Sequence, residues 1–104
     1  MVPISLPQFA GFQWDKGNQG KNWTRHKVSD EECEEVFFNL PVVVAPDPAH
    51  SERENRHYLL GRTNDGRRLF VVFTPRGDKV RVISARDMTR KERRAYHEAE
   101  KASA

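Results

Sequence analysis

At 104 residues, with 37% hydrophobic and 10% aromatic residues, the sequence holds enough large apolar side chains for one compact domain and too few residues for two. No apolar run approaches the ~20 residues that cross a bilayer, and the first residues lack the pattern of a secretory signal, so we expect a soluble cytoplasmic protein. The net charge is +3, and residues 76–104 hold nine bases against five acids, which predicts a cationic surface for nucleic acid or for an acidic protein segment.

The N-terminal part predicts a short strand followed by a helix. Residues 12–14 alternate apolar and polar side chains, and Asp15 is a suitable N-cap for a helix that runs to about Arg25. Gly17 and Gly20 each cost about 1 kcal/mol relative to alanine in a helix interior. This helix therefore needs tertiary packing in order to form.

The signals for a second helix are clearer. Ser29 and Glu32 have the spacing of a capping box, and Pro41 ends the helix near Asn39. Its apolar side chains recur at i, i+3, i+4 and i+7, at Cys33, Val36, Phe37 and Leu40. Acidic residues cover the outer face. We expect the lone Cys33 to be a small buried hydrophobic side chain, with a thiol pKa that its acidic surroundings raise.

Strands occupy most of the second half of the chain. They are predicted over residues 42–45, 56–63, 68–74 and 79–86. A polar loop over 46–55 separates the first from the second, and turns at 64–66 and 75–78 join the last three. Connections this short make consecutive strands antiparallel neighbours.

A final helix begins at a second capping box, formed by Thr89 and Glu92, and runs toward Lys101. We expect one face to lie against the sheet, with Ala95, Tyr96, Ala99 and Ala102. A basic stripe forms the other face, with Arg90, Arg94, His97 and Lys101. The predicted fold is an α+β domain of order β-α-α-β-β-β-β-α with an antiparallel sheet, two N-terminal helices and one C-terminal helix.

Several common motifs for chemistry are absent from the sequence. It has no glycine-rich phosphate loop, no Cys/His cluster of zinc spacing, no G-x-S-x-G and no EF-hand pattern. The acidic run over residues 30–35 is typical of a solvated helix face rather than of a metal site. We therefore expect no metal and no cofactor, which leaves His, Arg, Lys, Tyr and backbone dipoles for any catalysis.

A set of ordered segments resembles the BrnT family. They are FQWD (12–15), NWTRHKV (22–28), ECEEVF (32–37), DPAH (47–50), RHYLLG (56–61), VF (72–73) and RVISARDMTRKERRAY (81–96). The last segment, in which a strand leads directly into a helix, is the most specific of them. The resemblance covers residues 12–96.

The resemblance implies a toxin of a bacterial type II toxin–antitoxin pair, with a RelE-like fold, that cleaves RNA without a metal and inhibits translation. The implied partner is a BrnA-type antitoxin, which neutralises the toxin and carries the element that binds operator DNA. We expect the antitoxin to lay an acidic or amphipathic segment across the basic groove, and two toxins and two antitoxins to form a heterotetramer. The RNA is either free or bound to the ribosome.

The chain departs from the family pattern at three places. Residues 1–11 form an N-terminal extension to a single domain over 12–104, Asn18 stands where many relatives have lysine, and Lys27 stands where glycine is frequent. Asn18 and Lys27, with Arg25 in place of a lysine, motivate a second hypothesis, a catalytically weak binding module that acts mainly in a repressor complex with an antitoxin. A third is a plain nucleic-acid-binding domain.

RNA supplies its own nucleophile, the 2′-OH, so cleavage needs a base, an acid and cations that stabilise charge on the phosphate. The guanidinium groups of Arg62, Arg81 and Arg86 suit the last role, because each can donate two charge-assisted hydrogen bonds to phosphate. Strict strand alternation puts Arg81 and Arg86 on opposite faces, since they are five residues apart. They share a site only if a bulge or the end of the strand reorients one of them.

His26 is the acid/base candidate, because a histidine pKa of about 6.5 allows proton transfer in both directions near neutral pH. Its alternative role is to cap the end of its helix. Trp14 either stacks on an RNA base or belongs to the core, and Tyr96 either contacts phosphate or is structural. Arg25, Arg90 and Arg94 complete the predicted RNA contacts, although the last two equally suit a solvated helix face.

Overall fold

Five strands form one sheet in the order β1-β5-β4-β3-β2. The computed structural model describes residues 9–50 and 54–103. Its elements are β1 (Gly11–Phe12), α1 (Lys21–His26), α2 (Asp30–Glu35), β2 (Val43–Pro46), a 3-10 turn η1 (Pro48–His50), β3 (His57–Arg62), β4 (Arg68–Arg76), β5 (Lys79–Asp87) and α3 (Arg90–Ser103). The predicted α+β class and element order are confirmed.

The sheet is mixed rather than wholly antiparallel. Strands β2 to β5 pair antiparallel with their neighbours, but β1 runs parallel to β5, with Phe12 beside Val80. The expectation of an antiparallel sheet was therefore wrong for β1, because a strand of two residues gives no sequence signal for its direction. Phe9, in the part predicted as an extension, packs against the core beside Phe12, and the rest of that segment, residues 1–8, lies outside the described residues.

A β-bulge interrupts the pairing of β4 with β5. Val72 lies opposite Ser84, whereas the next residue of β4, Phe73, lies opposite Val82, so Ile83 is an extra residue in β5. Because an extra residue shifts the alternation of side chains by one, residues on its two sides exchange faces relative to a regular strand. This shift decides which side chains of β5 point to the same side.

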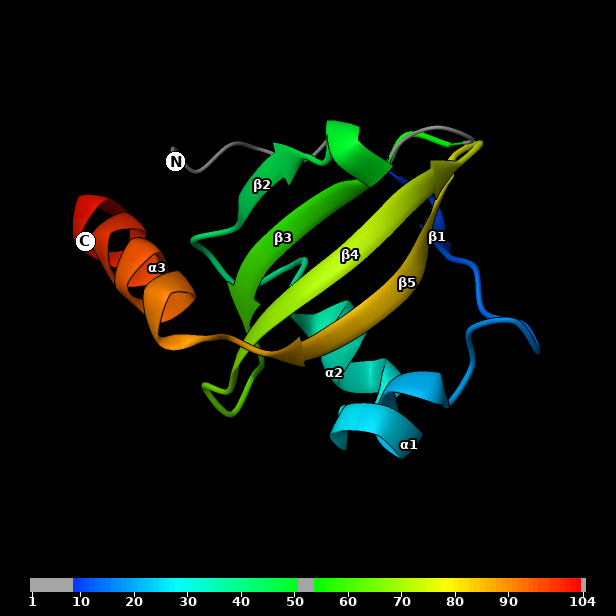
Figure 1. Cartoon of the computed structure of the whole chain (residues 1–104), viewed down its shortest axis with the longest axis horizontal. Helices are drawn as coiled ribbons and strands as arrows, with labels where there is room; N and C mark the ends of the chain where they lie inside the picture. Colours follow the sequence, from blue (N-terminus) through cyan, green and yellow to red (C-terminus); the bar gives the residue numbers. More distant parts are fainter. Residues whose placement is uncertain (1–8, 51–53, 104) are drawn as a thin grey trace.

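The two faces of the sheet are covered unequally (Figure 1). Helices α1 and α2 lie over one face, where Val28, Cys33, Val36 and Phe37 form the main core with apolar side chains of β3, β4 and β5. Helix α3 covers only one end of the other face, where Tyr96 and Ala99 pack on Val43, Leu60 and Met88. We call this second face the open face.

Both capping boxes predicted from the sequence are present in the structure. Ser29 and Glu32 form the predicted capping box of α2, and Thr89 and Glu92 form the same pair of hydrogen bonds at the start of α3. The predicted burial of Cys33 is confirmed: it has no exposed surface, and burial raises its thiol pKa to about 12. None of the described helices is long and apolar enough to span a membrane.

The helix boundaries differ from the predicted ones where glycine or the turn geometry intervenes. Helix α1 starts only at Lys21, because Gly20 precedes it with a φ of 71° and the chain before it forms turns. Helix α2 ends at Glu35 instead of near Asn39, and hydrogen-bonded turns carry Phe37 into the core. On α3 only Tyr96 and Ala99 are buried, whereas the other two alanines predicted to face the sheet, Ala95 and Ala102, are exposed.

Candidate functional site

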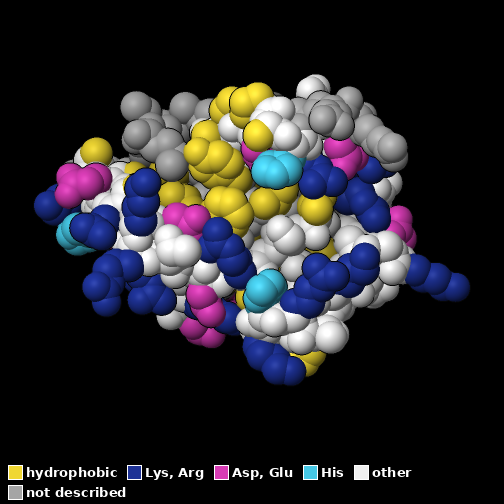
Figure 2. Space-filling model, in the orientation of Figure 1, with side chains coloured by type: hydrophobic (Ala, Val, Ile, Leu, Met, Phe, Trp, Pro, Cys, Tyr) yellow, Lys and Arg dark blue, Asp and Glu magenta, His cyan; other side chains and the backbone are white. Residues whose placement is uncertain are grey.

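Arginine side chains gather on the open face of the sheet. On β4 this face carries Arg68, Phe70, Val72 and Thr74, and on β5 it carries Arg81, Ser84 and Arg86, because those residues pair with one another across the strands. Figure 2 views the molecule from this side, with hydrophobic side chains over the middle and Lys and Arg side chains around them. The face is thus an apolar floor with a cationic border.

The bulge at Ile83 brings Arg81 and Arg86 to the same face. Arg81 pairs with Thr74 and Arg86 pairs with Phe70, and these two partners are an even number of residues apart on β4. The condition that the sequence left open is therefore met. The partners are four positions apart on β4, which places the two arginine backbones about 13 Å apart along the strand.

Arg86 is held in one orientation at the end of β5. Its Nη1 and Nη2 donate to Glu92 Oε1 and Oε2 over 2.8 and 3.0 Å, and its guanidinium carbon lies 4.1 Å from the centroid of the Phe70 ring. The hydrogen bond from Arg86 lowers the pKa of the Glu92 carboxyl. The paired carboxylate and the aromatic ring together fix the guanidinium plane at the border of the open face.

Arg81 is held from the other edge of β5. Its Nη1 and Nη2 donate to Asp15 Oδ2 and Oδ1 over 2.9 and 3.0 Å, and Nη1 also reaches Gln13 Oε1 at 3.1 Å. The hydrogen bond from Arg81 lowers the pKa of Asp15, and the same bond raises the pKa of Arg81. The segment that follows β1 therefore positions this guanidinium.

Arg62 lies at a different place, beneath α3. Its Nη2 donates to the backbone oxygen of Leu40 at 2.8 Å, and its Nη1 lies 3.5 Å from Glu100 Oε2, which also accepts from Arg68. These bonds tie α3 to the loop before β2. The three predicted arginines thus share a face, but different carboxylates hold them at separate points, and Arg62 serves the packing of α3.

His26 is the last residue of α1 and is exposed. The end of α1 lies near the end of β5, because Arg67 bonds both the His26 backbone and the Asp87 carboxylate. Arg67 Nη2 donates to the His26 backbone oxygen at 3.3 Å, and Nη1 donates to that of Lys27 at 2.7 Å. Lys27 itself closes the helix with a φ of 57°.

Sequence reasoning missed Arg67 as a site residue. Besides the two carbonyls, its guanidinium bonds both carboxylate oxygens of Asp87, at 2.8 and 3.1 Å, and Glu32 at 3.2 Å. It therefore joins the end of α1, the start of α2 and the end of β5. Its position after a tight turn did not indicate these contacts, because all the partners of its guanidinium are distant in the sequence.

Trp14 and Tyr96 have structural surroundings. Trp14 packs against the core on the helix-covered face, and its indole nitrogen donates to Glu34 Oε2 at 2.7 Å. Tyr96 has no exposed surface, and its hydroxyl donates to the backbone oxygen of Pro41 at 2.8 Å, so the predicted phosphate contact is not available to it. We leave both residues out of the candidate site.

The remaining predicted RNA contacts are exposed. Arg25 lies on α1, and Arg90 and Arg94 lie on α3. Asn18, by contrast, is a buried structural residue: its side-chain nitrogen donates to the backbone oxygens of Gln13 and Val82, each at 3.0 Å. A residue in this position holds the segment after β1 onto β5 and offers no cation to a substrate.

Comparison with known proteins identifies the family. Across the described residues no three His, Cys, Asp or Glu side chains group together as a metal site would require. No curated protein matches the chain. The family model for BrnT, the ribonuclease toxin of a type II toxin–antitoxin system, matches residues 14–92, a segment that includes the arginines of β5 and the start of α3. The chain therefore belongs to the BrnT family of ribonuclease toxins of type II toxin–antitoxin systems.

Proposed function

We propose that this toxin is an endoribonuclease that works without a metal ion and cleaves RNA on the open face of its sheet. The 2′ oxygen of the substrate attacks the adjacent phosphorus, the bond to the 5′ oxygen breaks, and a 2′,3′-cyclic phosphate forms. A base takes the 2′ proton, and an acid protonates the leaving oxygen. Cleavage of messenger RNA in the cytoplasm, free or on the ribosome, inhibits translation.

Arg86 binds the scissile phosphate in this proposal. Its guanidinium already holds a two-oxygen anion, the Glu92 carboxylate, in the fork geometry that suits phosphate. Arg81 binds a neighbouring phosphate of the same strand, and Arg25, Arg90 and Arg94 add long-range attraction for RNA. His26, close to the end of β5, is the acid or base.

The observation that supports the proposal best is the bulge at Ile83. A regular β5 would send one of Arg81 and Arg86 into the apolar core under α1 and α2, whereas the extra residue turns both toward the open face. Arg86 then stabilises the charge of the phosphorane, and Arg81, about 13 Å away along the strand, holds another phosphate of the same RNA. Because the chain belongs to a family of ribonucleases, we take the substrate of these arginines to be RNA.

The test is cleavage of RNA by purified protein in excess chelator. We expect cleavage with a cyclic phosphate at the new 3′ end, and a loss of about 100-fold or more in Arg86→Ala. Lys91→Gln, a change of the same charge on the exposed side of α3, is the control and should keep the activity. Absence of cleavage by the wild type, or equal rates for the wild type and Arg86→Ala, would contradict the proposal.

The type II family implies an antitoxin partner, and we propose that it is a BrnA-type protein. Its acidic or amphipathic segment covers the open face, where the cationic border attracts it. Two such pairs associate through the antitoxin, which alone contacts operator DNA. Light scattering of the purified complex is expected to give the mass of two toxins and two antitoxins, and the mass of one pair would contradict this stoichiometry.

One observation favours a second candidate, the weak binding module. Each predicted catalytic arginine is paired with a carboxylate of the chain itself, and Asn18 is a buried amide that offers no cation to a substrate. Such a protein would retain the antitoxin complex and lose toxicity. Expression without the partner separates the two candidates: growth arrest that disappears in Arg86→Ala supports the ribonuclease, and normal growth supports the binding module.

A further inference from the structure

A cationic hollow lies on the open face, beyond Arg81. It has a volume of about 870 Å³, within the range of about 300–1,000 Å³ that ligand sites have. Residues that follow β2 form one wall, and the end of β4 forms the other. Its lining comprises Ala49, His50, Glu54, Asn55, Arg56, Thr74, Pro75 and Arg76.

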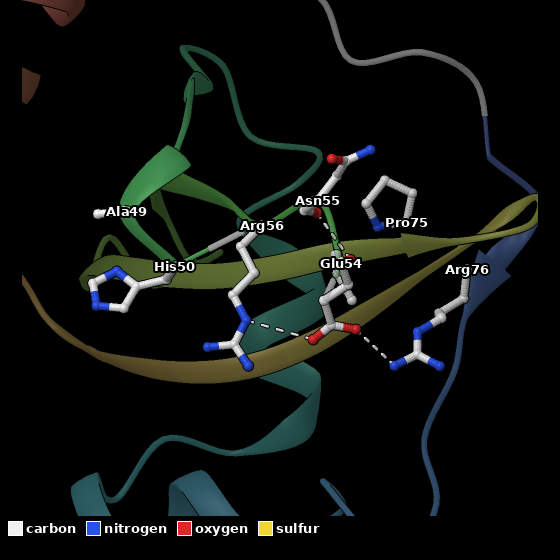
Figure 3. Close-up of a pocket in the computed structure, with 8 residues that line it drawn as sticks. Ala49, His50, Glu54, Asn55, Arg56, Pro75 and Arg76 are labelled. Atoms are coloured by element: carbon white, nitrogen blue, oxygen red, sulfur yellow. Dashed lines mark hydrogen bonds and ion pairs between the residues drawn. The ribbon is translucent and has the colours of Figure 1, made fainter. Parts of the chain in front are cut away.

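Glu54 lies between two arginines in this hollow (Figure 3). One carboxylate oxygen accepts from Arg76 Nη2 at 2.8 Å, and the other lies 3.4 Å from Arg56 Nε. The side chains of both arginines remain partly exposed, at 35% for Arg56 and 48% for Arg76. A carboxylate bridged by two guanidinium groups occupies the position that a phosphate takes in arginine-based anion sites.

The hollow adjoins the part of the open face that carries Arg81. Thr74 and Arg76 belong to the open face of β4, and Thr74 pairs directly with Arg81. Arg76 lies six residues from Phe70, the partner of Arg86, which corresponds to about 20 Å of strand. A single strand of RNA that reaches from Arg86 past Arg81 to Arg76 would span several nucleotides, as extended nucleic-acid grooves do.

We propose that this hollow is an RNA subsite, in which Arg56 and Arg76 bind a backbone phosphate several nucleotides away from the scissile bond. Glu54 occupies the subsite in the free protein and yields it to that phosphate. His50, on the rim of the hollow, lies beside the bound nucleotide. The inference rests on the proposed ribonuclease function, which makes RNA the ligand. It adds the path of the substrate strand over the sheet, from Arg86 past Arg81 to Arg76.

Binding of a strand that cannot be cut tests the subsite independently of cleavage. The probe is a 2′-O-methyl oligoribonucleotide of about 12 nucleotides, which has no free nucleophile and spans a groove of this length. Glu54→Gln removes the competing charge and should tighten binding about threefold to tenfold at low salt. Glu31→Gln, on the exposed side of α2, makes the same change of charge away from the groove and should leave affinity within about twofold.

The opposite variant removes the two cations. Arg56→Gln/Arg76→Gln should weaken binding about tenfold and flatten the salt dependence of log K by about 0.7, since the pair binds one phosphate and each phosphate contact of a single strand contributes about 0.7. Lys91→Gln/Lys101→Gln on α3 is the charge-matched control. In cleavage assays, the Arg56→Gln/Arg76→Gln variant should have a raised KM and an unchanged kcat. The reason is that the two wild-type arginines bind the substrate equally well in the ground state and in the transition state.

Three results would overturn the subsite. The first is that Arg56→Gln/Arg76→Gln binds the oligonucleotide as tightly as the lysine control variant. The second is that Glu54→Gln binds it no tighter than Glu31→Gln. The third is that Arg56→Gln/Arg76→Gln weakens only the complex with the antitoxin. The last result would identify the hollow as a protein-binding surface instead. Thermal unfolding of each variant checks that the fold is retained. If the wild type binds the probe through this hollow but never cleaves RNA, the subsite stands and the ribonuclease proposal fails.

Discussion

Replacement of Arg67 by methionine tests whether this side chain joins three elements beside the open face. Methionine keeps much of the aliphatic stem and removes every donated hydrogen bond. The wild-type guanidinium bonds Asp87 twice, Glu32 twice through longer contacts, and the backbone oxygens of His26 and Lys27. The variant leaves those two carbonyls and the Asp87 carboxylate without this donor.

The expected loss of unfolding free energy follows from the exposure of each partner. Asp87 is 52% exposed, so its ion pair with Arg67 contributes at most about 1 kcal/mol. The two bonds to backbone carbonyls contribute about 1 kcal/mol each, and the weaker contact with Glu32 adds a few tenths. The sum is about 2 to 3 kcal/mol, which for a domain of this size lowers Tm by roughly 8 to 15 °C.

The effect also depends on pH in a defined direction. The hydrogen bond from Arg67 holds the pKa of Asp87 below its ordinary value of 3.8. A carboxyl with a lowered pKa in the folded state contributes stability above its unfolded pKa and loses it as the pH falls through the folded pKa. The gap between wild type and Arg67→Met should therefore stay constant from about pH 5 to 8 and narrow below about pH 4.

Urea unfolding at several pH values measures both quantities, and Arg68→Met is the matched control. Arg68 is the next residue, is also partly exposed at 39%, and pairs with the single acid Glu100. Its replacement should cost less than about 1 kcal/mol. A loss at Arg67 no larger than that at Arg68, or a gap that widens in acid, would refute the assignment of Arg67 as the link between the elements.

Three further changes probe other parts of the fold. Gly61→Ala should cost about 2 to 3 kcal/mol, because a Cβ there would lie 2.8 Å from the Val36 backbone oxygen, and an unchanged Tm would contradict this packing. Tyr96→Phe leaves the Pro41 oxygen without its donor and should lower stability by about 1 to 3 kcal/mol with RNA affinity unchanged; weaker RNA binding at full stability would restore the hydroxyl as a ligand. The Cys33 thiol, with its pKa raised to about 12 by burial, should react with a thiol reagent only as fast as the chain unfolds, and rapid labelling of the native protein would show that it is accessible.

Local signals in the sequence predicted most of the secondary structure. A capping box is a contact over three residues, so Ser29 with Glu32 and Thr89 with Glu92 could be identified from spacing alone. The strands β3 to β5 followed from alternation and from the turns between them. The parallel pairing of Phe12 with Val80 did not, because its energy comes from residues far away in the chain.

The candidate site was less accessible to sequence reasoning for the same reason. The sequence predicted Arg81 and Arg86 as site residues from their chemistry. Their common orientation depends on the extra residue Ile83, and no glycine or proline beside it indicates a bulge. Tyr96 and Asn18 are both buried and therefore cannot contact a substrate. The sequence did not indicate this, because a polar residue type does not show whether the side chain is buried or exposed. The hydrogen bonds of the Arg67 guanidinium all join residues 20 or more positions apart.

The glutamates in the first turns of α2 and α3 each make one local and one distant contact. Glu32 accepts from the Ser29 amide and from Arg67, and Glu92 accepts from the Thr89 amide and from Arg86. Formation of the first turn of each helix is therefore thermodynamically linked to binding of the distant guanidinium, that of Arg67 for α2 and that of Arg86 for α3. A ligand that draws Arg86 away from Glu92 removes one of the contacts that order this carboxylate, so the effect of occupancy on the open face reaches the first turn of α3.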